Sequence, residues 1–333
     1  MATLETSHPT LRDLTSRLDP DGKIDAVAEI LSETNEMLED MVWKEGNLET
    51  GHKGTIRTGL PEPTWRKIYG GVQPTKSTTA QITDTCGMLE AYAEVDKALA
   101  DLNGNTSAFR LSEDRAHVEG MSQAMASTVL YGDESVNPER FTGFASRFSD
   151  KTAQNGDNIV LSSGSSPDNA DNASIYLVVW GDNVHGIYPK GSKAGLQMSD
   201  KGEVTIENID GNGGRMEAYR SHYRWDGGLH VKDWRYVVRI QYNDEDLTKD
   251  VSAGPDLIDL MTIACDIPPN LAGRPAFYMN RRAKSFLRRQ MVNKVKNSTL
   301  AMDEVAGKRV MTFDGVPCRR TDALLRTETG VTV

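Results

Sequence analysis

Six histidines offer the widest chemical range in this sequence, because imidazole can transfer protons or bind metal ions near neutral pH. None of them forms HExxH or another spacing typical of a metal site. His222 and His230 flank a predicted tight turn and could meet across a hairpin, but no third ligand is placed beside them. The sequence therefore predicts no metal ion and no cofactor. The six positions are His8, His52, His117, His185, His222 and His230.

The three cysteines, Cys86, Cys265 and Cys318, are far apart and form no CxxC pair. Neither a disulfide framework nor a zinc site follows from such spacing. We expect buried or incidental thiols in a reducing compartment.

A glycine-rich turn at 181–195, GDNVHGIYPKGSKAG, brings Asp182, His185 and Lys190 close together in the chain. Carboxylate, imidazole and amine are the groups of acid–base catalysis, so an intracellular enzyme with its site in this turn is one alternative. The turn does not fit a phosphate-binding loop, because Ile187 stands where lysine must follow the second glycine. A concave pocket with shifted pKa values would identify such an enzyme.

A strongly basic helix is predicted at 280–296, NRRAKSFLRRQMVNKVK, inside a stretch from Asp266 to Asp303 that holds no other acidic residue. Such a helix binds polyphosphate or pairs with acidic groups of an adjacent subunit. No aromatic stacking platform accompanies it, which slightly favours the adjacent subunit. Its cationic residues are Arg281, Arg282, Lys284, Arg288, Arg289, Lys294 and Lys296.

Residues 54–84 cannot form a helix, because Pro61, Pro63 and Pro74 interrupt them, and we predict an extended chain or an open hairpin. Long segments of this kind are usually functional. The stretch carries large apolar side chains that are poorly suited to water, so burial against another subunit is one expectation and folding back on the chain's own core is the other. The candidate contact residues are Trp65, Arg66, Ile68 and Tyr69.

The remaining pattern mixes helices and strands, which predicts an α+β fold. Apolar spacing predicts helices at 24–42, 86–102, 112–131 and 255–267, and small residues in the third favour close packing up to a stop at Gly132. The run SIYLVVWG at 174–181 predicts a strand covered on both faces. Alternation from Trp234 to Ile240 predicts a half-exposed strand, and residues 309–325 end the chain with a strand-like segment.

Charge and hydropathy exclude several classes of protein. Acidic residues outnumber Lys and Arg by 48 to 38, giving a net charge of −10, which argues against a protein that coats nucleic acid with its whole surface. The N-terminal stretch MATLETSHPT does not resemble a signal peptide, and IYLVVW is too short to span a bilayer. We expect a soluble intracellular product with no membrane partner.

Four long motifs occur in one order along the chain: RTGLPEPTWRKIYGGVQPTKS, AFRLSEDRAHVEGMSQAMASTVLYGDESVNPERFTGFASRF, VHGIYPKGSKAGLQ and YRWDGGLHVKDWRYVVRI. In this order the sequence resembles the major capsid proteins of short-tailed and related tailed bacteriophages, over roughly residues 10–330.

The resemblance implies the Hong Kong 97-like capsid fold, with mixed and antiparallel sheets. By that resemblance residues 1–53 are the N-terminal arm and 54–84 the extended loop. Residues 85–154 are the helices of the peripheral domain, with the spine helix at 112–131. Residues 155–265 form a sheet-rich segment, and 266–333 supply the axial-domain helix and strands.

The resemblance also implies a structural protein without catalysis, which assembles through hexamers and pentamers into the icosahedral head around double-stranded DNA. Its expected partners are other copies of itself, scaffolding and portal proteins, a cementing or decoration protein, and DNA through weak contacts. Its expected location is the virion capsid, after assembly in the bacterial host cytoplasm. A portal-associated or decoration protein is the alternative within phage structural proteins.

Overall fold

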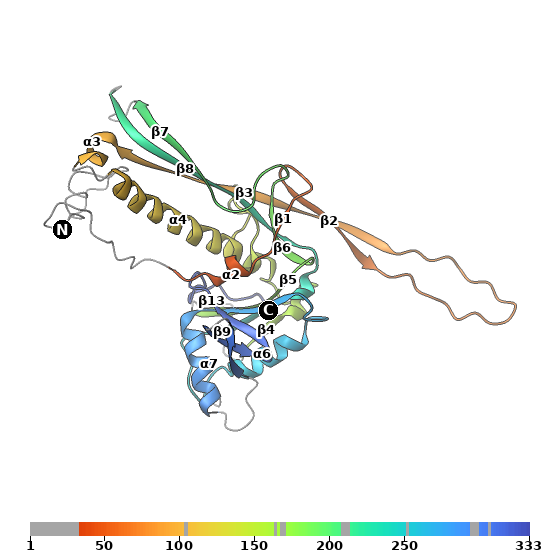
Figure 1. Cartoon of the computed structure of the whole chain (residues 1–333). Coiled ribbons are helices and arrows are strands. Elements are labelled where there is room, and N and C mark those ends of the chain that lie inside the picture. Colours follow the sequence, from red (N-terminus) through yellow and green to blue (C-terminus); the bar gives the residue numbers. More distant parts are fainter. Residues whose placement is uncertain are drawn as a thin grey trace. The chain divides into compact units, whose positions relative to one another are not determined.

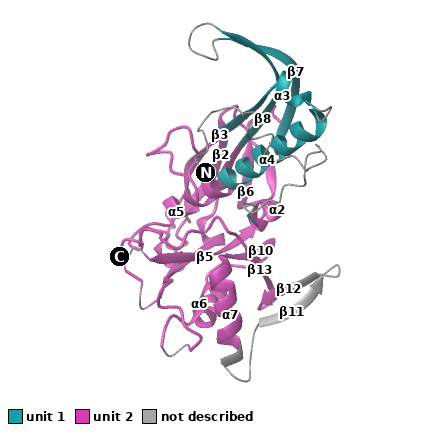
Figure 2. Cartoon of the chain, turned by 90° about the vertical axis from the view of Figure 1, so that its left-hand side faces the viewer, with its two compact units in different colours: residues 1–33, 88–125, 195–226 teal, residues 34–87, 126–194, 227–333 magenta. Residues whose placement is uncertain are grey.

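The computed structural model describes residues 33–102, 106–162, 165–166, 171–207, 214–250, 253–293, 300–305 and 308–333, and only the backbone within 292–310. The chain, whose elements are labelled in Figure 1, divides into two compact units that Figure 2 shows in different colours. Unit 1 comprises residues 1–33, 88–125 and 195–226, and unit 2 comprises residues 34–87, 126–194 and 227–333.

A seven-stranded sheet forms the centre of unit 2, in the order β11-β12-β13-β10-β5-β9-β4. Strand β5 pairs antiparallel with β9 and β10, whereas β13 is parallel to β10 and β4 is parallel to β9. Every residue of β5 is buried, which confirms the prediction of a strand covered on both faces. The strands are β4 (Ile159–Leu161), β5 (Asn172–Trp180), β9 (Val237–Asn243), β10 (Arg274–Met279), β11 (Leu300–Val305), β12 (Lys308–Phe313) and β13 (Val316–Arg320).

Helices α6 (Leu257–Asp266) and α7 (Arg281–Asn293) pack on this sheet, and both were expected from the sequence. Leu260 and Met261 of α6 and Leu287 of α7 join the sheet's buried apolar cluster. The side chain of Asp256 caps α6 by accepting a hydrogen bond from the backbone N–H of Asp259 at 3.2 Å.

The expected half-exposed strand at 234–240 is wrong in detail. Residues Trp234–Tyr236 form the 3₁₀ helix η3, and β9 is buried except at its last residue. The misleading signal is Arg239, which is 3% exposed and forms an ion pair with buried Glu328 at 2.8 Å between nitrogen and oxygen. A charged side chain usually marks a solvent face, but here a paired carboxylate allows its burial.

The second sheet has the order β1-β6-β8-β3-β2, and β7 pairs with β8 in unit 1. Strands β3 and β8 run through both units. Because His222 and His230 both lie on β8, they do not face each other across a hairpin. The strands are β1 (Trp43–Glu45), β2 (Gly51–Gly59), β3 (Thr78–Asp96), β6 (Val184–Tyr188), β7 (Gln197–Glu207) and β8 (Arg215–Val231).

The predicted helix at 86–102 is wrong, because β3 continues to Asp96 and only the short α3 (Lys97–Ala100) follows it. Ala93 and Val95 are buried, whereas Tyr92 is 52% exposed, so burial alternates with a period of two. The apolar residues of this stretch fit a helical stripe as well as a strand, and pairing with neighbouring strands decides between them.

Helix α4 (Thr106–Tyr131) confirms the predicted spine helix and begins six residues earlier than the expected 112. Within unit 1, Met121 packs with Ala93 and Tyr223. Gly132 ends the helix, and a side chain there would meet the carbonyl oxygens of Phe141 and Thr128 at 2.2 and 2.6 Å. The short α5 (Phe144–Arg147) and the 3₁₀ helix η2 (Gly156–Asn158) follow in unit 2.

The predicted helix at 24–42 falls partly outside the described residues. Its described part contains only α2 (Glu36–Asp40), because the backbone at Met41 is extended with φ −63° and ψ 127° and the chain continues into β1. Met37 and Met41 are buried, and Arg319 pairs with Glu36 and Asp40. The acidic residues of this segment therefore bind the chain's own arginine.

Candidate functional site

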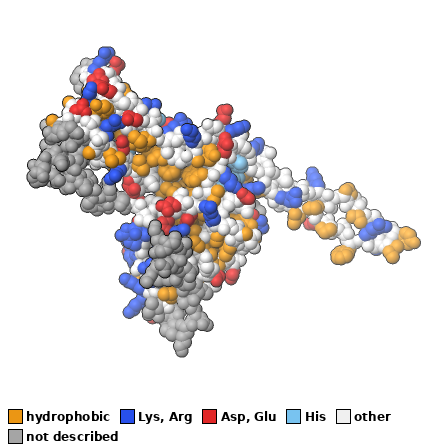
Figure 3. Space-filling model, in the orientation of Figure 1, with side chains coloured by type: hydrophobic (Ala, Val, Ile, Leu, Met, Phe, Trp, Pro, Cys, Tyr) orange, Lys and Arg blue, Asp and Glu red, His pale blue; other side chains and the backbone are white. Residues whose placement is uncertain are grey.

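A hairpin of unit 2 extends into a long loop, residues 60–77, that carries exposed apolar side chains (Figures 1 and 3). Strands β2 and β3 pair antiparallel from Gly51↔Thr85 to Gly59↔Thr78. Beyond this ladder Trp65 and Tyr69 are fully exposed, and Ile68 is 84% exposed. The hairpin confirms the extended conformation expected for 54–84. It excludes folding back of these side chains on the chain's own described core.

A tight turn fixes the end of this loop. The backbone N–H of Gly70 donates to the carbonyl oxygen of Lys67 at 2.9 Å, which places Ile68 and Tyr69 at the two corner positions. Tyr69 has φ +63°, a left-handed conformation that is rare for an aromatic residue. Strained residues of this kind cluster at functional sites.

The loop is also cationic. Arg66 and Lys67 are exposed beside the apolar side chains, and Lys76 adds a third cation, whereas Glu62 is the one carboxylate in the loop. We define the hairpin tip as residues 60–77. Its surface combines apolar anchors with an excess of positive charge.

A cluster of imidazoles lies on three strands of the second sheet, with His52 on β2, His185 on β6 and His230 on β8. Ring centroids are 4.5 Å apart for His52 and His230, 5.2 Å for His185 and His230, and 5.9 Å for His52 and His185. His230 Nδ1 lies 2.6 Å from a carboxylate oxygen of Asp84, whose other oxygen accepts from Arg147 at 2.8 Å. We call these five residues the histidine cluster.

Burial favours the neutral form of two histidines of this cluster, His185 and His52. The pKa of His185 is lowered to about 4, first by burial and second by the charge of His230. The pKa of His52 is lowered by the same two causes. Burial alone would raise the pKa of Asp84, but the hydrogen bond with His230 and the charge of Arg147 outweigh it and leave the pKa below its usual value.

Sequence reasoning missed the histidine cluster. Its members come from β2, β3, β6, β8 and α5, and His52 and His230 are separated by most of the chain. The strand register brings four of them together in pairs, because His185 lies opposite His230 and His52 lies opposite Asp84. No group of three or more His, Cys, Asp or Glu among the described residues could hold a metal ion.

The glycine-rich turn does not assemble the acid–base group considered above. His185 is buried among the imidazoles, whereas the side chain of Asp182 is 93% exposed and pairs with Lys44. Lys190 is exposed, and its backbone N–H donates to the carbonyl oxygen of Leu48 at 3.1 Å. Among the described residues, no hydrogen bond or ion pair joins Asp182, His185 and Lys190 in one site.

The basic helix is α7, and three of its predicted cationic side chains contact the chain itself. Arg282 donates to the carbonyl oxygen of Asp244 at 3.0 Å, and Lys284 donates to that of Cys318 at 2.9 Å. Arg281 lies 3.6 Å from a carboxylate oxygen of Asp322. Arg288 and Arg289 are exposed, whereas Lys294 and Lys296 lie outside the described residues.

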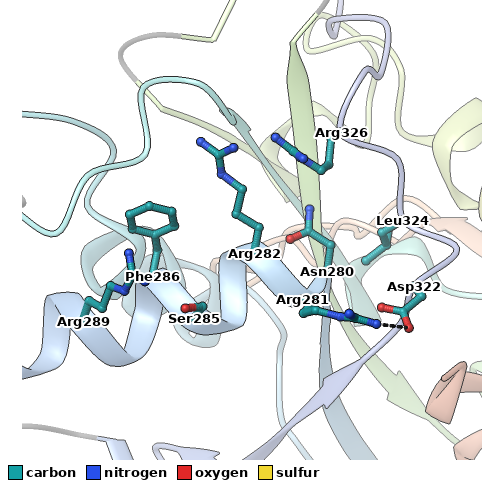
Figure 4. Close-up of a pocket in the computed structure, with 9 residues that line it drawn as sticks. All are labelled: Asn280, Arg281, Arg282, Ser285, Phe286, Arg289, Asp322, Leu324 and Arg326. Carbon is teal, nitrogen blue, oxygen red and sulfur yellow. Dashed lines mark ion pairs between the residues drawn. The ribbon is translucent and has the colours of Figure 1, made fainter. Parts of the chain in front are cut away.

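A pocket of about 660 Å³ opens between the first half of α7 and the segment 322–326 (Figure 4). Four arginines and one aspartate line it, and Figure 3 shows Lys and Arg side chains gathered over this edge of unit 2. We call it the arginine pocket. Its lining residues are Asn280, Arg281, Arg282, Ser285, Phe286, Arg289, Asp322, Leu324 and Arg326.

Within the described part of the chain, no helix is both long and apolar enough to cross a membrane.

Comparison with known proteins identifies the family. A family model described as major capsid protein GP7 matches residues 19–332. A chain in the near-atomic-resolution structure of bacteriophage Epsilon15 is 35% identical, with a TM-score of 0.80 and 100% coverage of both chains. A chain of the bacteriophage JBD30 capsid is 9% identical, with a TM-score of 0.51, covering 90% of this chain and 95% of that one. No curated protein sequence matches significantly.

These matches, together with the spine helix, the hairpin and the two sheets, define a phage capsid protein with the Hong Kong 97-like α+β fold. The chain belongs to the major capsid protein GP7 family. It is a structural protein of the virion head that self-associates into a shell, and it is not an enzyme. The decoration, portal-associated and enzyme alternatives are thereby excluded.

Proposed function

We propose that this chain assembles through hexamers and pentamers into an icosahedral head around double-stranded DNA, and that the hairpin tip is a principal contact with a neighbouring copy. The observation that carries the proposal is the exposure of Trp65, Ile68 and Tyr69 at the end of a paired β-ladder. Soluble monomers rarely expose apolar groups so prominently unless a partner covers them.

The free energy available at the tip is substantial. Burying one large apolar side chain contributes about 1.5–3 kcal/mol, and aromatic residues are enriched among those that dominate interfaces. Trp65, Ile68 and Tyr69 offer three such side chains, and Arg66 can add an ion pair or a cation–π contact on the neighbour. A projecting loop gains this contact area without requiring a larger core in each subunit.

The segment roles follow from the same proposal. Residues 1–53 act as the arm and 54–84 as the extended loop, and 112–131 serve as the spine of a peripheral domain within 85–154. Residues 155–265 form a sheet-rich segment, and 266–333 contribute to an axial domain around the capsomer centre. The packing of α7 on the seven-stranded sheet supports a compact axial domain.

Further partners belong to the proposal as well. Scaffolding, portal and cementing or decoration proteins would act with this chain during assembly in the bacterial host cytoplasm. The net charge of −10 supports weak contacts with the packaged DNA, because a strongly cationic lumen would retain the genome too tightly.

The test replaces Trp65, Ile68 and Tyr69 together by alanine and compares the variant with wild type by negative-stain electron microscopy and sedimentation velocity. We expect wild type to form shells or capsomers and the variant to remain as smaller species. The matched control replaces three exposed apolar residues outside the hairpin, Leu111→Ala/Val136→Ala/Leu325→Ala. Wild type that stays monomeric, or a control as defective as the tip variant, would overturn the proposal.

A further inference from the structure

The arginine pocket holds more positive charge than its own carboxylates neutralise. Asp322 accepts from Arg320 at 2.8 Å and lies 3.6 Å from Arg281. Asp244 sits behind the pocket and is likewise shared by two arginines, with Arg326 Nε at 2.6 Å and Arg282 Nε at 3.5 Å. The pKa of Arg326 is raised mainly by Asp244, and Glu245 adds only a weaker contribution.

Arg289 is a fifth arginine in this region, where the carboxylates described above are only Asp322 and Asp244. Its Cζ atom lies 5.0 Å from the centroid of the Phe286 ring, and that of Arg282 lies 5.6 Å from the same ring. Stacking on an aromatic face restrains a guanidinium while leaving its N–H donors available at the edge. The arginines are therefore partly preorganised around an unneutralised positive charge, which is a suitable environment for an anionic ligand.

The form of the pocket favours a polypeptide over duplex DNA. Its volume of about 660 Å³ is in the range that accommodates small ligands or a few side chains. Phe286 and Leu324 add apolar surface to the lining, which suits an aliphatic carboxylate side chain better than a phosphodiester. Proteins hold a duplex chiefly through phosphates along an open surface, so a local recess gains little contact with it.

The acidic composition of this chain indicates a ligand for the pocket. With 48 acidic against 38 basic residues, every neighbouring copy presents surplus carboxylates. The shell brings many copies together, so the local concentration of these carboxylates is high. We propose that the arginine pocket binds a carboxylate-bearing segment of a second copy of this chain. The proposal rests on the assembly function above and assigns α7 to a subunit contact.

The decisive variant is Arg289→Glu, with Arg288→Glu as its matched control. Both residues are exposed on the same helix, and only Arg289 lines the pocket. Assembly of the full chain is followed without DNA by light scattering against protein concentration, and thermal unfolding is measured in parallel. We expect the concentration for half-assembly to rise about tenfold for Arg289→Glu and less than about twofold for Arg288→Glu.

A second pair of variants distinguishes the loss of this contact from a folding defect. Arg289→Ala deletes the charge without reversing it and should raise the half-assembly concentration about threefold, while Arg289→Lys should restore most of the assembly. If both Arg289→Glu and Arg289→Ala assemble as wild type, the pocket proposal is overturned. Normal DNA-free assembly combined with weaker retention of DNA in filled heads would also overturn it, in favour of phosphate.

The outcome for the pocket is separable from the outcome for the assembly function. Wild type that forms no shell or capsomer contradicts the function itself. Wild type that assembles while the Arg289 variants match it contradicts only the pocket proposal and leaves the hairpin contact untouched.

Discussion

The hairpin tip and strand β5 use similar side chains in opposite surroundings. Trp180 and Tyr176 of β5 are 0% exposed, whereas Trp65 and Tyr69 of the tip are fully exposed. Trp180 Nε1 donates to the Tyr278 hydroxyl at 2.7 Å inside unit 2. The contrast shows that large apolar side chains have two separate roles in this chain, one in the core of the subunit and one on its surface.

The difference has a thermodynamic meaning. Residues of β5 leave water when the single chain folds, so they contribute to the free energy of unfolding. Residues of the tip leave water only if a neighbour covers them, so they contribute to association. Variants in the two regions should therefore fail in different assays.

The largest expected effect is on assembly. Trp65→Asp places a charge at the exposed anchor, and we expect loss of shells, with the half-assembly concentration rising at least about a hundredfold. The thermal unfolding temperature of the free subunit should stay within about 2 °C of wild type, because Trp65 is already exposed. A lowered unfolding temperature would contradict the comparison, because it would show that Trp65 stabilises the single subunit.

The next effect concerns the core beside β5. Arg239 forms a buried ion pair with Glu328 and donates to the Ser174 hydroxyl at 3.0 Å. Arg239→Leu leaves the carboxylate buried and uncompensated, so the free energy of unfolding should fall by about 3–5 kcal/mol.

Arg235→Leu is the control for that variant. Its side chain is 56% exposed where it pairs with Asp233, so the pair should contribute no more than about 1 kcal/mol. Denaturant unfolding measures both variants, and equal losses would contradict the burial argument.

Acidification should act at the histidine cluster. The unfolded chain binds protons on histidine below pH 6.5, whereas the folded chain binds a proton on His185 only near pH 4. Stability therefore falls as the pH drops from about 6.5 to 4, by about 3 kcal/mol for His185 once it is fully protonated. The charged and titratable groups that act on the cluster are His52, His185, His230, Asp84, Lys44, Lys232 and Arg147.

Unfolding measured from pH 7.5 to 4 checks this slope. His185→Gln should flatten it, because the buried group whose pKa is lowered to about 4 is then absent. An equally steep slope in the His185 variant would remove the cluster from the explanation.

The smallest effect tests close packing at the end of the spine helix. A side chain at Gly143 would meet the carbonyl oxygens of Thr128 and Val129 at 2.7 Å, so Gly143→Ala should lower the free energy of unfolding by about 1–3 kcal/mol. Gly120 lies in α4, where an added Cβ atom would meet no other atom within 4 Å. Gly120→Ala should therefore raise the free energy of unfolding by up to about 1 kcal/mol. Thermal unfolding should show shifts of opposite sign.

Sequence reasoning succeeded where one local property decided the structure. The prolines of 54–84 excluded a helix, the continuous apolar run of β5 required a doubly covered strand, and Gly132 ended the spine helix. It failed at 86–102, where strand pairing overrides a spacing compatible with a helix, and at Arg239, where a distant carboxylate makes burial possible.

The candidate sites were predictable to different degrees. Trp65, Arg66, Ile68 and Tyr69 were named from composition and lie exposed together, although their contact with a neighbour remains a proposal. The basic helix was predicted. Which of its cationic side chains form bonds within the chain depends on Asp244 and Asp322, which are distant in sequence. The histidine cluster needs five separate elements, and no short-range pattern reports it.

The most direct measurement is a cryo-electron microscopy map of the assembled shell at a resolution that shows side chains. The account predicts density for Trp65, Ile68 and Tyr69 buried against a neighbouring copy. A shell in which these three side chains remain exposed to solvent would contradict the assignment of the hairpin tip as a subunit contact.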